Sequence, residues 1–179
     1  MSSALQLLPH YTFEDWQGWE GQWELIHGVP YAMSPAPVPK HQIIANALGL
    51  ELGLALKKCK HCKAMQPVDY KIADDIIVQP DLLVVCKNIE KSYLDFPPSL
   101  VAEILSPATA LKDRHTKFQL YESQKINYYI IISPDTEEAE VYELINDVYK
   151  LSAKGKDIHF NFSFEDGCAA NIDFSEIWK

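Results

Sequence analysis

The pattern of apolar and polar residues in the first third of the chain predicts a short helix, a hairpin and a long helix. The segment "YTFEDWQ" has Thr12 three residues before Asp15, which is typical of a capped helix start. In "QWELIHGVPYAMSP", branched and aromatic residues flank Gly28, which predicts a hairpin turning at that glycine. The segment "KHQIIANALGLELGLALKKC" has apolar residues three or four positions apart, so it predicts the longest helix.

Strand patterns dominate the rest of the chain. The apolar runs that each predict one strand are "AMQPVDYKI", "IIVQPDLLVVC", "SLVAEILS" and "INYYIIIS". Between the last two, "SPATALKDRHTKFQLYESQ" predicts a helix with Thr109 as its cap. The closing segments "EAEVYELIN", "DVYKLSA" and "IHFNFSF" predict an antiparallel meander.

This order of elements predicts an α/β or α+β fold, with a mixed central β-sheet flanked by helices and antiparallel strands added at both ends. The chain has 179 residues, of which 47% are hydrophobic, so it is long enough for one domain with a real core and short for two. We therefore expect a single domain over residues 1–179. We expect the central strands to carry the chemistry.

Composition and charge narrow the class of protein. No uninterrupted apolar stretch reaches about 18 residues, and "MSSALQLLPHYTFEDW" lacks the pattern of a secretory signal, so we expect a cytoplasmic protein without a membrane span. The formal net charge of −9 argues against a protein that coats nucleic acid indiscriminately. A local cluster of lysines at positions 57, 58, 60 and 63 is either a solvated helix end or, less commonly, a DNA contact.

The four cysteines are Cys59, Cys62, Cys86 and Cys168. A chain of this size with a sufficient core does not need disulfides, so we expect reduced thiols. Cys59 and Cys62 form a CxxC with His61 between them, which raises the hypothesis of a zinc-binding interaction protein. Structural zinc needs four ligands, however. Cys86 lies in an apolar strand, and Cys168 lies far off near the C-terminus with no second CxxC, so we expect a metal-free loop.

Two acidic residues interrupt the most apolar predicted strands. Asp81 lies in "IIVQPDLLVVC", and Glu103 lies 22 positions later in "LVAEILS". A period of two places each carboxylate on a face shared with core side chains. A buried, ionised carboxylate must be paired, protonated or bound to a cation. Unless both acids end their strands in water, the pattern favours a hard divalent ion, Mg²⁺ or Mn²⁺, held by Asp81 and Glu103.

The helix after Glu103 adds further candidates. Asp113, Lys117 and Tyr121 are four residues apart and share one stripe of a helix, from which Lys117 reaches Glu103 if the helix crosses the sheet. The simpler interpretation is a surface Asp113–Lys117 ion pair, with Tyr121 in the core. His41, in the first turn of the long helix, either faces the same cleft or is an ordinary surface histidine, the commoner case.

The ordered set of motifs resembles a known family. "PD" at Pro80 and Asp81, "EILSPAT" from Glu103 and "KDRHTKFQLYE" around Lys117 resemble the Uma family of restriction-endonuclease-like proteins, in the PD-(D/E)xK nuclease superfamily. The similarity also takes in "WELIHGVPYAMSPAPVPKHQ" and "NYYIIISP", and it covers most of the chain from about residue 11 to residue 144. The PD alone is weakly specific, whereas the ordered set is specific.

The resemblance implies a restriction-endonuclease-like core and a metal-dependent endonuclease that hydrolyses phosphodiester bonds. It assigns Asp81 and Glu103 as ligands of Mg²⁺ or Mn²⁺, and Glu24 as a further acid from the N-terminal part. The lysine expected two residues after Glu103 is replaced by Leu105, and Lys117 is the matching position in the next helix. Tyr121 would hydrogen-bond Lys117 or the phosphate.

Because Leu105 replaces the lysine of the superfamily pattern, an alternative function is a catalytically inactive nuclease fold that binds nucleic acid or protein. For the active enzyme the implied partner is nucleic acid, DNA in preference to RNA. We also expect a homodimer, because the segments "YYIII" and "HFNFSF" would offer a sheet edge and a symmetric dimer is the commonest assembly.

Overall fold

The computed structural model describes residues 9–33 and 38–179, and it has a mixed α+β fold with three β-sheets. The N-terminal segment used to exclude a secretory signal lies largely outside the described residues. The strands are β1 (Trp23–Ile26), β2 (Val29–Ala32), β3 (Lys63–Met65), β4 (Tyr70–Ala73), β5 (Ile76–Val78), β6 (Leu82–Val85), β7 (Leu100–Ile104), β8 (Tyr128–Ser133), β9 (Glu138–Ile145), β10 (Val148–Gly155), β11 (His159–Ser163) and β12 (Ala169–Asp173). The helices are α1 (Phe13–Gln17), α2 (Pro39–Ala55), η2 (Leu56–Lys58), η3 (Lys112–Lys117), α3 (Phe118–Ser123), η4 (Glu165–Gly167) and η5 (Phe174–Trp178).

The largest sheet has six strands in the order β10-β9-β8-β7-β6-β3. Only β7 and β8 run parallel, and the segment that joins them contains η3 and α3. All residues of β6 and β7 are buried, because both faces of the sheet are covered. This is the mixed central sheet that the sequence predicts.

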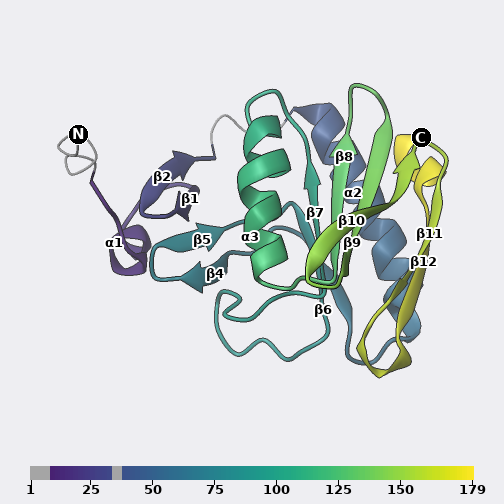
Figure 1. Ribbon diagram of the computed structural model, residues 1–179, viewed down its shortest axis with the longest axis horizontal. Helices are drawn as coiled ribbons and strands as arrows, with labels where there is room; N and C mark the ends of the chain where they lie inside the picture. Colours follow the sequence, from purple (N-terminus) through teal and green to yellow (C-terminus); the bar gives the residue numbers. More distant parts are fainter. Residues whose placement is uncertain (1–8, 34–37) are drawn as a thin grey trace.

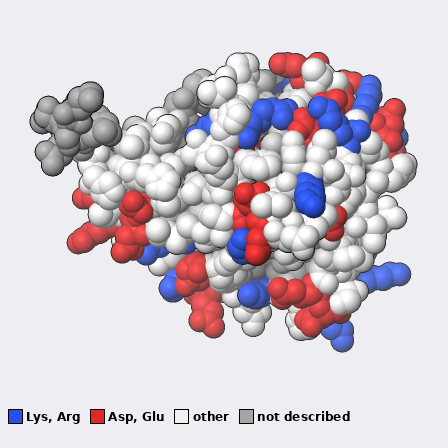
Figure 2. Space-filling view, in the orientation of Figure 1, with Lys and Arg blue, Asp and Glu red and all other residues white. Residues whose placement is uncertain are grey.

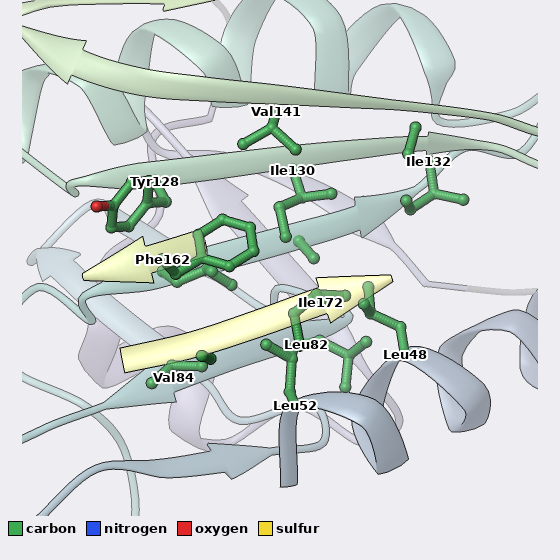
Figure 3. Close-up of a cluster of buried hydrophobic side chains, with 14 of the residues drawn as sticks. Leu48, Leu52, Leu82, Val84, Tyr128, Ile130, Ile132, Val141, Phe162 and Ile172 are labelled. Carbon is green, nitrogen blue, oxygen red and sulfur yellow. The ribbon is translucent and has the colours of Figure 1, made fainter. Parts of the chain in front are cut away.

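Each face of the six-stranded sheet carries its own core. On one face, Leu48 and Leu52 of α2 pack with Leu82, Val84 and the β11–β12 hairpin (Figure 3). On the other face, Leu120 and Tyr121 of α3 pack in the cluster that contains Leu83 and Val101. Figure 1 shows α3 in front of the sheet and α2 behind it. The alternation of burial partners along β6 and β7 follows from the period of two in a strand.

The second sheet has four strands in the order β2-β1-β5-β4. Two segments expected to be single strands are each divided between this sheet and the larger one. The run "IIVQPDLLVVC" forms β5 and β6, and "AMQPVDYKI" forms β3 and β4. In each case a proline, Pro80 or Pro67, lies between the two strands, and proline cannot donate a ladder hydrogen bond.

Several local predictions are confirmed. Thr12 and Asp15 form a reciprocal capping box at the start of α1. The β1–β2 hairpin turns at His27 and Gly28, both with positive φ, and a Cβ at Gly28 would lie 2.3 Å from the His10 ring. The helix before β8 begins directly after Thr109, as expected.

The prediction of a continuous closing meander is wrong. β9 and β10 pair in the large sheet, but β11 pairs with β12 in a separate two-stranded sheet that lies against α2. Figure 1 shows this hairpin at the opposite end of the molecule from the β1–β2 hairpin. The segment "YYIII" is in β8, which is paired on both sides and offers no edge; the homodimer itself stays a prediction.

The prediction of reduced cysteines is also wrong. The structure has disulfides between Cys59 and Cys168 and between Cys62 and Cys86. The register of β3 on β6 pairs Lys63 with Val85, so Cys62 and Cys86 are the next residues along that ladder. The sequence separations of 109 and 24 residues concealed these contacts, which only the tertiary fold creates.

No helix in the described part of the chain is long and apolar enough to cross a membrane.

Candidate active site

Asp81 lies where the chain passes from the small sheet to the large one. It directly precedes β6, and its Oδ2 accepts a 2.7 Å hydrogen bond from the backbone N–H of Ile104. The antiparallel register pairs Leu82 with Ala102, so one further step brings Asp81 opposite Glu103. One oxygen of Asp81 therefore provides the last hydrogen bond of the β6–β7 ladder. Residues directly opposite one another in a ladder project from the same face of the sheet, so Asp81 and Glu103 lie on the same face.

Glu103 is buried in the middle of the large sheet and is held by two side chains from the following helix. Its Oε1 accepts hydrogen bonds from Lys117 Nζ at 2.8 Å and from Tyr121 OH at 2.7 Å. All three side chains are at most 3% exposed. The helical stripe of Lys117 and Tyr121 does reach the Glu103 strand, as the sequence suggested it could.

Glu24 of β1 joins the same group from the small sheet. Its Oε1 lies 2.7 Å from Lys117 Nζ and accepts a 2.9 Å hydrogen bond from the backbone N–H of Gln79, while its Oε2 accepts from Lys112 Nζ. Glu24 is fully buried, and Lys117 bridges it to Glu103. A carboxylate from β1 and one from β7 thus share a single ammonium group.

The helix winding explains how two lysines five residues apart reach one carboxylate. In an α-helix, side chains at i and i+5 point in different directions. Residues 112–117 instead form a π-helical turn, whose hydrogen bonds join i and i+5 and whose occurrence is concentrated at functional sites. This winding brings Lys112 and Lys117 to the same side of the helix, against Glu24.

The Asp113–Lys117 pair is not the surface ion pair considered from the sequence. Both side chains are buried, and Asp113 Oδ1 lies 3.6 Å from Lys117 Nζ. Asp113 Oδ1 has no hydrogen-bond partner among the described residues. The sequence spacing correctly predicts that Asp113 and Lys117 are neighbours. Because the helix packs against the sheet, however, both side chains are buried within the acidic cluster.

His41 is likewise not a surface residue. It is 7% exposed, and its Nε2 lies 3.3 Å from Asp81 Oδ2. Its Nδ1 is buried without a hydrogen-bond partner in the described part of the chain. Burial opposes protonation, but the contact with Asp81 prevails and raises the pKa of His41 above its usual range. The first turn of α2 therefore contributes to the site.

The electrostatics of the cluster are dominated by crowded carboxylates. Burial raises the pKa of Glu103 well above its usual range, against the attraction of Lys117 and with a further increase from Asp113. Burial likewise raises the pKa of Asp113. For Lys117, burial disfavours the charged form, yet the surrounding carboxylates prevail and raise its pKa.

The pKa of Glu24 shifts in the opposite direction to that of Glu103. Burial alone would raise its pKa, but the ammonium groups of Lys117 and Lys112 and the Gln79 N–H hold it below its usual range. With Asp81, the cluster contains four carboxyl groups and only two ammonium groups, so full ionisation leaves two negative charges uncompensated by lysine. Such an excess favours an additional cation.

Asp81 and Glu103 fit a divalent ion such as Mg²⁺, which keeps much of its water shell when it is bound by a protein. Asp81 and Glu103 each use one oxygen for the contacts above, and the other oxygen accepts no hydrogen bond from residues 9–33 or 38–179. Over those ranges, no group of three or more His, Cys, Asp or Glu side chains is arranged to hold a metal by itself. Mg²⁺ is commonly bound by one or two carboxylates with water and substrate phosphate completing the shell.

The fold brings together all five site residues expected from the sequence: Glu24, Asp81, Glu103, Lys117 and Tyr121. Sequence reasoning missed Lys112, because its spacing from Lys117 does not share a face in a regular helix. The accessible members of the site are Asp81 and Lys112, whose side chains are 19% and 18% exposed. Any ligand must therefore approach from the side of these two residues.

Comparisons with known proteins show the family and the fold of this chain. A family model described as "Putative restriction endonuclease", Uma2, matches residues 11–159. A solved structure described as "a putative nuclease belonging to DUF820" from Anabaena variabilis ATCC 29413 superposes with a TM-score of 0.75. The match covers 93% of this chain and 97% of that one at 16% identity, which shows a shared fold. No curated protein matches the sequence. Because the family match spans most of the chain, the protein belongs to the Uma2 family of restriction-endonuclease-like proteins.

Proposed function

We propose that the protein is a metal-dependent endonuclease that hydrolyses phosphodiester bonds, in DNA in preference to RNA. The observation that carries this proposal is the position of Lys117, whose Nζ lies 2.8 Å from Glu103 and 2.7 Å from Glu24. Leu105, which directly follows β7, stands where the superfamily pattern has a lysine. Lys117, from the following helix, instead forms an ion pair with Glu103, which explains why this charged side chain is buried.

The proposed ligands of Mg²⁺ or Mn²⁺ are Asp81 and Glu103. A bound divalent ion would polarise the phosphate and lower the pKa of a coordinated water. Lys117 and Tyr121 act as positioning residues, because both donate to Glu103 Oε1 and so fix the carboxylate plane and the direction of its other oxygen. Glu24 holds Lys117 and Lys112 in place through both of its oxygens.

Lys112 is the proposed contact for the substrate phosphate. The Lys112 side chain is 18% exposed, whereas that of Lys117 is only 3% exposed. An ammonium beside a phosphate stabilises the charge that develops on the phosphoryl oxygens during hydrolysis. His41, in contact with Asp81, is placed to hold that carboxylate in its orientation.

Two further observations bear on the partner. Figure 2 shows basic and acidic side chains interspersed on the face in view, in keeping with the net charge of −9 and with a local phosphate contact in place of a broad basic surface. A cavity of about 150 Å³ beside Gln79 is lined by Trp16, Trp19 and Trp23. Indole rings are platforms on which unpaired bases stack, and the Gln79 N–H binds Glu24 of the site.

A second candidate is an inactive nuclease fold that binds nucleic acid or protein. The observation that favours it is the burial of Lys117 among Glu24, Glu103 and Asp113, which gives the lysine a structural task without any substrate. The two functions predict the same fold and differ in cleavage. A nuclease assay therefore separates them.

The experiment compares the wild-type protein with Asp81→Asn on supercoiled DNA, linear DNA and RNA. Each reaction contains Mg²⁺, Mn²⁺ or a chelator, and product is followed by gel electrophoresis. We expect cleavage by the wild type with a divalent ion, and neither the chelated sample nor Asp81→Asn should cleave. The inactive variant, purified identically, excludes a contaminating nuclease.

The melting temperature provides the second readout. A ligand that binds only the folded state raises it in a concentration-dependent way. We expect Mg²⁺ or Mn²⁺ to raise the melting temperature of the wild type but not of Asp81→Asn. Absence of cleavage on every substrate, together with nucleic-acid binding in a gel-shift assay, would establish the binding-module function instead.

A further inference from the structure

The fold gathers all four cysteines of the chain at one place. Cys59 and Cys62 follow the end of α2 and η2, Cys86 directly follows β6, and Cys168 directly precedes β12. The Cα atoms of Cys59 and Cys168 are 5.7 Å apart, and those of Cys62 and Cys86 are 4.0 Å apart. Two residues that bend the chain separate Cys59 from Cys62, so the two cysteine pairs are neighbours.

With the disulfides intact, no group of three or more His, Cys, Asp or Glu side chains in residues 9–33 and 38–179 is arranged to hold a metal, but reduction of both disulfides would free the four thiols that a tetrathiolate site needs. Cys59 and Cys62 form the CxxC turn that holds two ligands of many zinc centres, and Cys86 and Cys168 bring two more. All four side chains belong to or pack against one hydrophobic cluster. The objections from the sequence were the position of Cys86 in an apolar strand and the distance of Cys168 along the chain; the fold nevertheless brings Cys86 beside Cys62 and Cys168 beside Cys59.

The surroundings also suit a negatively charged zinc centre. Four thiolates around Zn²⁺ leave a net charge of −2, which nearby ammonium groups stabilise. The exposed lysines next to the CxxC are Lys57, Lys58, Lys60 and Lys63. Cys62 and Cys86 are buried, while Cys59 and Cys168 are partly exposed, so a thiol reagent can reach the centre from one side.

We propose that the four cysteines form a zinc site when reduced and the two observed disulfides when oxidised. In the reducing direction, two molecules of a dithiol each transfer two electrons and two protons to one disulfide and leave as cyclic disulfides. The four thiols so formed bind one Zn²⁺ as thiolates and release four protons to solvent. In the oxidised form each sulfur is bonded to its partner, and no thiolate is available to a metal.

Two of the cysteines lie beyond the ends of α2, which contains His41, and β6, which directly follows Asp81. α2 has His41 in its first turn and Cys59 beyond its C-terminal end. β6 has Asp81 directly before its first residue and Cys86 directly after its last. A zinc ion bound by all four cysteines would link the segment after α2 to the end of β6, whereas the disulfides join Cys59 to Cys168 and Cys62 to Cys86.

The test uses the full chain, reduced with a dithiol and freed of metal, then titrated with Zn²⁺ or Co²⁺ under anaerobic conditions. We expect four titratable thiols, one zinc per chain, and with Co²⁺ the intense visible bands of a tetrahedral centre and thiolate-to-cobalt charge transfer from four thiolates. Oxidation should release the metal. A reduced protein that binds no zinc at equimolar metal would overturn the proposal.

Variants identify the ligands. Cys86→Ser and Cys168→Ser should each lose stoichiometric zinc binding, whereas His61→Ala, at an exposed position inside the CxxC, is the matched control and should keep it. Zinc retained by both serine variants, or lost in His61→Ala, would refute the four-cysteine ligand set. The cobalt spectrum of the wild type counts thiolates without any variant, so a serine variant that fails to fold does not decide the outcome.

Discussion

Lys117→Met removes the charge at the centre of the acidic cluster while keeping an unbranched side chain of similar length. Lys117 Nζ lies 2.7 Å from Glu24 Oε1, 2.8 Å from Glu103 Oε1 and 3.6 Å from Asp113 Oδ1. The lysine side chain is 3% exposed and its three partners are also buried, so water cannot replace the lost ammonium without opening the structure. We expect this substitution to destabilise the protein strongly.

The magnitude follows from the contacts. At an effective dielectric constant of about 20, each contact corresponds to about 5 to 6 kcal/mol of Coulomb attraction. Most of this attraction is offset by the cost of removing the ions from water, several kcal/mol for each. Removing one partner of a buried pair leaves an uncompensated charge and typically costs about 3 to 5 kcal/mol. We expect a loss in that range for the free energy of unfolding at neutral pH.

The pH dependence tests the cause of the loss. The pKa values of Glu103 and Asp113 are raised in the folded state, and loss of the neighbouring ammonium raises them further. The folded variant therefore binds more protons than the unfolded chain above their usual values of 4.5 and 3.8, so its stability falls as pH rises through the folded-state pKa values. The difference from wild type should be larger at pH 8 than at pH 5.

Urea denaturation followed by circular dichroism, in metal-free buffer at both pH values, measures these differences. The matched control is Lys154→Met, because Lys154 also contacts two carboxylates, Glu138 and Glu140, but is 47% exposed. That control should change stability little at either pH. A loss for Lys117→Met no larger than the control, or one that does not depend on pH, would refute the role of Lys117 as the counter-ion of the cluster.

Three further predictions concern the same site. Asp81→Asn should keep the fold, because its amide oxygen can still accept from the Ile104 N–H, but should abolish stabilisation by Mg²⁺ in a thermal melt and lower cleavage by about 100-fold or more. Glu24→Gln should cost about 3 to 5 kcal/mol in urea denaturation at pH 7; because the folded-state pKa of Glu24 is lowered, its contribution is present above 4.5 and is lost as pH falls through the folded-state value. Leu105→Lys, added to Lys117→Met, should recover part of the cleavage rate if a strand lysine reaches Glu103; no recovery in a variant that circular dichroism shows to be folded would count against the exchange of roles.

The sequence by itself determined much of the local structure and singled out the acidic residues of the candidate site. The capping box at Thr12, the hairpin at Gly28 and the long helix follow from short-range hydrogen bonding, turn geometry and apolar spacing, which are encoded within a few residues. Asp81 and Glu103 could be singled out because a carboxylate in an apolar strand is costly without a partner. The ordered motifs around them carried the family resemblance, which the family match confirms.

Only the tertiary structure decided how these residues are partnered. Prolines alone do not reveal that the strands on either side of Pro80 enter different sheets, which is how Glu24 of one sheet meets Lys117 beside the other. The π-helical turn that aligns Lys112 with Lys117 depends on packing and cannot be read from helical periodicity.

The same holds for His41 and the cysteines, whose partners lie 24 to 109 residues away. Apolar spacing predicts which face of an element is buried, but not which distant element covers it. Burial and long-range contact are properties of the assembled chain, because they depend on which surfaces exclude water together. For this reason the sequence identified the acidic residues, while the fold decided that lysine neutralises part of their charge and that four cysteines share one place.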